Sequence, residues 1–99
     1  MQEMHKLLAM LVRENIPFEI HPFQLTLNEC TWQIASPSKE NQIIDAVSHK
    51  YTYGGNDGKI EILSEFGEDV VGWLTAEEAL PYFQEAIAEA KRRSEKANG

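Results

Sequence analysis

Residues 43–63, with the sequence IIDAVSHKYTYGGNDGKIEIL, contain the strongest local signal in the chain. The stretch 43–53 is rich in β-branched and aromatic residues and has no helical stripe. A turn-forming stretch follows at 54–58, with the sequence GGNDG. Residues 59–63, with the sequence KIEIL, come after it. A strand, a glycine-rich turn and a second strand predict a β-hairpin.

Further strands are expected on the N-terminal side of this hairpin. Residues 18–27 alternate, but the apolar positions change from even to odd numbers at Pro22, so we expect a bulge or bend there. Residues 30–34 form another alternating stretch. Cys30 is in phase with Trp32 and Ile34, which predicts that its thiol faces the core.

Helices are expected at both ends of the chain. Apolar residues at i, i+3, i+4 and i+7 predict a helix over 2–14, ended by a left-handed Asn15: Met4, Leu7, Leu8 and Leu11. Ala9, Met10 and Val12 broaden this apolar stripe, so the helix is expected to be well covered or partly buried in a partner.

The last helix is expected to begin with a capping box formed by Thr75 and Glu78. Pro81 predicts a kink after the first turn, followed by a straight helix to about Arg93 and frayed residues after 94. The short apolar run 70–74 before it is either an edge strand or an extended approach to the helix.

These elements predict a single α+β domain over residues 1–99, in the order α-β-β-β-β-α with room for a short fifth strand at 70–74. A mostly antiparallel sheet with two helices on one face would bury every apolar stripe. The length of 99 residues fits one domain.

Composition excludes several classes of function. The net charge of -7, from 16 acidic and 9 basic residues, argues against direct binding of nucleic acid. A single cysteine excludes an internal disulfide. No secretory leader and no apolar segment of the ~20 residues that a membrane span needs is present, so we expect a cytoplasmic protein.

No catalytic or metal-binding constellation is visible, which predicts a protein that is not an enzyme and has no metal or cofactor. His5, His21 and His49 lack the spacings of a preformed metal site. The acidic residues at 61, 65, 68 and 69 match no calcium loop and are typical of a solvated face.

The segment 49–59 is the best candidate for ligand contact. Glycine amides can bind an anion, lysines add positive charge, and tyrosines can stack on a planar group. The candidate ligand-binding residues are Trp32, Tyr51, Tyr53, Gly54, Gly55, Asn56 and Lys59. The alternative interpretation is a hairpin whose glycines serve only its turn and whose tyrosines cover the sheet.

Three stretches carry a family resemblance: residues 16–19, residues 48–63 with their Tyr-Gly-Gly, and residues 70–78. They resemble small phage and prophage accessory proteins of Gram-positive, Clostridia-like bacteria, and Pro81 departs from the uninterrupted helix of that group. The resemblance implies a viral protein in the host bacterial cytoplasm that acts by occupying a component of host defence.

Two hypotheses follow for its function. The leading one is a non-enzymatic anti-defence protein, a homo-oligomer that sequesters a nucleotide-like immune signal. The alternative is an acidic protein–protein inhibitor that occupies the nucleic-acid-binding groove of a host defence effector.

Overall fold

The structure is a computed structural model that describes residues 2–49, 58–65, 67 and 69–98, the side chains of 96–98 excepted. Its elements follow in the order α1 (Gln2–Arg13), β1 (Glu19–Thr26), β2 (Glu29–Ser36), β3 (Ile44–Val47), β4 (Ile60–Ser64), β5 (Val71–Leu74) and α2 (Ala76–Asn98). The described strands form one antiparallel sheet in the order β1-β2-β3-β4-β5. This architecture confirms the α+β prediction, and the run 70–74 supplies a fifth strand.

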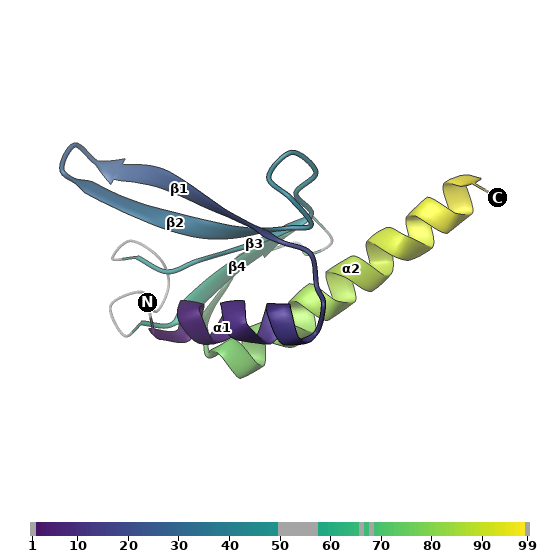
Figure 1. Ribbon diagram of the computed structural model, residues 1–99, viewed down its shortest axis with the longest axis horizontal. Helices are drawn as coiled ribbons and strands as arrows, with labels where there is room; N and C mark the ends of the chain where they lie inside the picture. Colours follow the sequence, from purple (N-terminus) through teal and green to yellow (C-terminus); the bar gives the residue numbers. More distant parts are fainter. Residues whose placement is uncertain (1, 50–57, 66, 68, 99) are drawn as a thin grey trace.

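Both helices cover the same face of the sheet (Figure 1). Cross-strand pairs such as Ile34 with Ala46 place the even-numbered side chains of the central strands toward the helices. The fully buried side chains on that face come from α1, from the strands and from α2: Met4, Leu7, Leu11, Ile34, Ile44, Ile60, Ile62 and Phe83. One core therefore joins the two ends of the chain.

The boundaries of both helices depend on local backbone contacts. Asn15 has a φ of 57°, and the Ile16 amide donates to the Leu11 carbonyl at 3.0 Å, which confirms the predicted left-handed stop. The Thr75 amide donates to Glu78 Oε1 at 3.0 Å, and the Glu78 amide donates to Thr75 Oγ1 at 3.2 Å. The capping box is thus complete.

The predicted end of the last helix was wrong. α2 continues through Pro81 and past Arg93 to Asn98, because Glu95, Lys96 and Ala97 are good helix formers and no proline or glycine interrupts residues 94–98. On α1, the broad apolar stripe is only partly covered, and Val12 is 63% exposed.

The strand boundaries also differ from the predictions. β1 runs unbroken through Pro22, which pairs with Trp32, and the irregularity lies instead between Gln24 and Thr26. Proline is tolerated because β1 is the first strand of the sheet and needs no second ladder. β3 ends at Val47, earlier than the predicted strand over 43–53, of which residues 50–53 lie outside the described residues.

Cys30 is exposed, so the prediction of a core thiol was wrong. The predicted phase of the strand was correct, because Ile34, which alternates in phase with Cys30, is fully buried. The tip of the β1–β2 hairpin extends beyond the helices (Figure 1), so neither helix covers Cys30. Alternation predicts which face a side chain occupies, and it does not predict how far the core reaches.

The molecule is elongated, with extents of 48 × 27 × 26 Å. Two parts project from the body: the β1–β2 hairpin and the C-terminal half of α2 (Figure 1). Within the described part of the chain, no helix is both long and apolar enough to cross a membrane.

Candidate functional site

The predicted ligand site is only partly visible. Tyr51, Tyr53, Gly54, Gly55 and Asn56 lie outside the described residues. The two other candidates, Trp32 and Lys59, are described and come from β2 and from the residue before β4. β3 and β4 are antiparallel neighbours, which confirms that the segment joins two paired strands.

Trp32 lies on the helix side of the sheet, where it packs partly buried against the core. Its ring centroid lies 5.6 Å from that of His5 on α1, with the two planes tilted by 57°. This geometry is a favourable aromatic contact. Trp32 is therefore held in place by α1 while part of its surface stays accessible.

Lys59 acts electrostatically on two carboxylates, Glu3 of α1 and Glu78 in the first turn of α2. The amide of Ala76 donates to Glu3 Oε1 at 2.8 Å, and this bond, followed by Lys6 and Lys59, holds the pKa of Glu3 below its usual range. The pKa of Glu78 is lowered chiefly by its capping bonds with Thr75 and further by Lys59. Lys59 is thus the smallest of the causes that lower the pKa of these two carboxylates.

The first turn of α1 connects the two described candidates. His5 contacts Trp32, and Glu3, two residues earlier on the same turn, interacts with Lys59.

Two contacts define the ends of the segment between β3 and β4. The Ser48 hydroxyl donates to the Lys59 carbonyl at 2.8 Å, and this bond joins the two ends of the segment. The His49 ring lies 6.0 Å from that of Phe23 at an interplanar angle of 75°. Cross-strand pairing places this second aromatic pair on the face opposite Trp32.

A polar cluster on the face away from the helices connects β2, β3 and the loop between them. Gln33 Nε2 donates to Asp45 Oδ2 at 3.0 Å and to Gln42 Oε1 at 3.3 Å, and Lys39 Nζ donates to Gln33 Oε1 at 3.3 Å. Burial raises the pKa of Asp45. The members of the cluster bond one another, so we assign it a structural role in holding the loop.

A groove of about 500 Å³ lies between the end of β4 and one face of α2. It is lined by Ser64, Glu65, Gly67, Tyr82, Glu85, Ala86, Glu89 and Arg93. Arg92 and Arg93 both donate to Glu89, and the bond from Arg92 is the main cause of the lowered pKa of Glu89. Sequence reasoning missed this site, although the helical spacing of residues 82, 85, 86, 89 and 93 was the available signal.

The described residues contain no group of three or more His, Cys, Asp or Glu side chains that could hold a metal ion. No family model, no curated protein and no solved structure matches the chain.

Proposed function

We propose that the protein is a non-enzymatic phage or prophage protein that counters host defence from the host cytoplasm. It acts as a homo-oligomer that sequesters a nucleotide-like signalling molecule. The observations that support this function are the contact of Trp32 with His5 on the first turn of α1 and the electrostatic attraction of Lys59 to Glu3 on the same turn. Trp32 and Lys59 offer an aromatic surface for a base and a cation for a phosphate.

The surroundings of Trp32 and Lys59 indicate how much each residue contributes to the affinity for a nucleotide. Lys59 lies in the electrostatic field of Glu3 and Glu78, so a phosphate that binds there is repelled by two carboxylates. Stacking of a base on an aromatic side chain contributes roughly 1–3 kcal/mol. Trp32 is therefore expected to contribute more to binding than Lys59 does.

The test is native mass spectrometry of the protein mixed with a pool of cyclic and ADP-ribose-type nucleotides. We expect a stoichiometric gain of one nucleotide mass per site. Trp32→Leu should weaken binding by about fivefold or more, which corresponds to the lower end of the stacking contribution. Lys59→Gln should weaken it less.

Matched controls are available for both variants. Trp73→Leu replaces the other tryptophan, which is 60% exposed on β5, and Lys39→Gln removes one charge on the opposite face of the sheet. Both controls should bind as the parent does. Uptake of no nucleotide, or equal binding by all variants, would contradict the proposed site.

The second candidate is the acidic inhibitor of a protein effector, and Trp73 is the observation that favours it. Trp73 has a φ of 61° at a bulge of β5 and is 60% exposed. A tryptophan held exposed in a rare backbone conformation is typical of a functional contact, and exposed tryptophans often anchor protein interfaces. This candidate predicts that Trp73→Leu, and not Trp32→Leu, abolishes capture of the effector, with binding that weakens steeply as salt is raised.

A further inference from the structure

We propose that the C-terminal half of α2 pairs antiparallel with α2 of a second copy of this chain, through a two-fold contact centred near Glu89. The contact would give the homo-oligomer of the proposed function its surface, although it does not depend on which ligand is bound. Three features of α2 support it: its length, its charge distribution and the groove beside it.

α2 is longer than the core that it covers. Among the side chains of α2 that the structure describes, Ala86 is the last buried one, whereas residues 91–95 are exposed. The C-terminal half projects from the body of the molecule (Figure 1). A short helical segment without tertiary contacts is marginally stable in water, so a partner along this half would stabilise it.

The charges of α2 are divided between its two halves. Four acidic residues lie up to position 89, and a basic run follows before Glu95: Glu77, Glu78, Glu85 and Glu89, then Lys91, Arg92 and Arg93. An antiparallel pair of such helices places the acidic part of each copy against the basic part of the other. A surface of this kind is complementary to itself, as a two-fold interface requires.

The groove indicates which residues of the two helices would face each other. Tyr82, Glu85, Ala86, Glu89 and Arg93 lie along one helix face and line it, so this face is hollowed where α2 passes the end of the sheet. With the two-fold axis near Glu89, Arg93 of the second copy faces Glu85, and the reverse contact forms equally.

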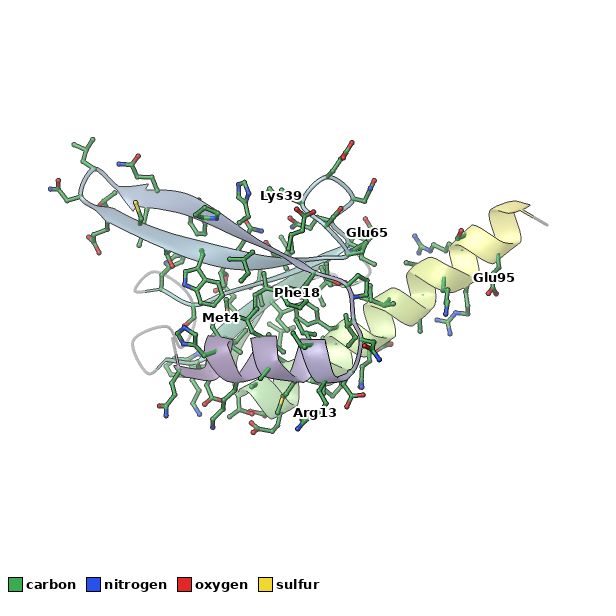
Figure 2. The ribbon with its side chains drawn as sticks, in the orientation of Figure 1. Met4, Arg13, Phe18, Lys39, Glu65 and Glu95 are labelled. Atoms are coloured by element: carbon green, nitrogen blue, oxygen red, sulfur yellow. The ribbon has the colours of Figure 1, made fainter. Side chains whose placement is uncertain are left out.

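Glu65 adds a further carboxylate at the sheet side of the groove. Figure 2 shows it at the end of the sheet beside α2, while Glu95 lies on the projecting half of the helix. The tip of a second α2 that enters the groove would therefore meet acidic groups from two elements. This favours a basic helix end as the occupant.

The ion pairs within α2 are compatible with this contact. Glu89 accepts from Arg92 and Arg93, both of which are about two-thirds exposed at 67% and 64%. Exposed pairs of this kind contribute little stability on their own. A guanidinium has five N–H donors, so each arginine can keep its bond to Glu89 and donate to a second copy. At the centre of the contact, these arginines also offset the two facing Glu89 carboxylates.

The experiment uses two opposite charge reversals in the full chain. A basic variant carries Glu85→Lys and Glu89→Lys, and an acidic variant carries Arg92→Glu and Arg93→Glu. Native mass spectrometry and light scattering should show a dimer for the parent and at least a tenfold loss of dimer affinity for each variant alone. An equimolar mixture of the two variants should recover the dimer, because each then meets the opposite charge.

A control variant carries Glu14→Lys and Glu40→Lys, the same charge change at exposed positions outside α2. It should remain dimeric, and circular dichroism should show equal helix content in all variants. A monomeric parent, a dimer that survives both reversals, a mixture that fails to recover it, or loss of the dimer in the control would overturn the proposal. Association of the groove with only a basic segment of another protein would also overturn it.

The same spectra separate this inference from the proposed function. A dimer that takes up no nucleotide would contradict ligand sequestration and leave the α2 contact intact. A parent that binds nucleotide as a monomer would contradict the α2 contact and leave the ligand site intact.

Discussion

Asp45 shows how a single side chain can oppose the stability of the fold that it helps to organise. It accepts a hydrogen bond from Gln33 and holds the loop before β3 as part of the polar cluster. Burial nevertheless raises its pKa, because the low-dielectric surroundings disfavour the ionised carboxyl. The folded protein therefore retains the Asp45 proton to a higher pH than the unfolded chain does.

The stability that this group contributes is present below the unfolded pKa of aspartate and is lost as pH rises through the folded pKa. We expect Asp45→Asn to be more stable than the parent at neutral pH, with the difference shrinking toward about pH 4. Urea unfolding at several pH values measures it. Asp69→Asn, at an exposed position, is the control and should change nothing. A stability difference that does not vary with pH would contradict the prediction.

At the scale of elements, α2 contains a residue that destabilises a helix. Pro81 lies inside the helix, where it has no amide to donate to the carbonyl four residues earlier, and its side chain is exposed. The helix persists because the capping box stabilises its first turn and Phe83 and Ala86 anchor the next turns in the core. Tertiary packing thus overrides the local preference.

Pro81→Ala should stabilise the protein by roughly 1–3 kcal/mol, since it restores a helical hydrogen bond and removes a steric clash. Urea unfolding gives the value. Pro22→Ala in edge strand β1 is the matched control and should shift stability by no more than about 0.5 kcal/mol. If Pro81→Ala proves destabilising, the proline is required for the path that α2 takes across the core.

At the scale of the whole molecule, stability is concentrated where the two helices meet the sheet. Phe83 is fully buried among residues from α1, α2 and the strands, whereas Leu27 at the tip of the β1–β2 hairpin is 92% exposed. The two projecting parts therefore add surface without adding core. This division leaves them available for contacts with other molecules.

Phe83→Ala should lower the free energy of unfolding by about 3–5 kcal/mol through the loss of buried contacts and the cavity left behind. Leu27→Ala should change it by no more than about 0.5 kcal/mol. Both are compared with the parent by urea unfolding at one protein concentration, because dimerisation makes stability concentration-dependent. A comparable loss for Leu27→Ala would show that the hairpin tip is packed in solution.

The residue types of the candidate site could be chosen from the sequence, whereas their surroundings could not. Trp32 and Lys59 were selected for their chemistry and remain predictions, and the structure adds that Trp32 contacts His5 of α1. The carboxylates on which Lys59 acts were not predictable, because Glu3 and Glu78 are distant from it in sequence. The groove beside Tyr82 was missed because half of it belongs to the end of β4.

The sequence by itself determined the features that depend on residues within one or two helical turns, or on strict alternation. These include the left-handed Asn15, the capping box of Thr75 and Glu78, and the inward face of Ile60 and Ile62. Only the tertiary structure decided the exposure of Cys30, the continuity of β1 through Pro22 and the projection of α2. Local patterns reflect backbone geometry and short-range hydrogen bonds, whereas burial and charge pairing depend on which distant element covers a residue.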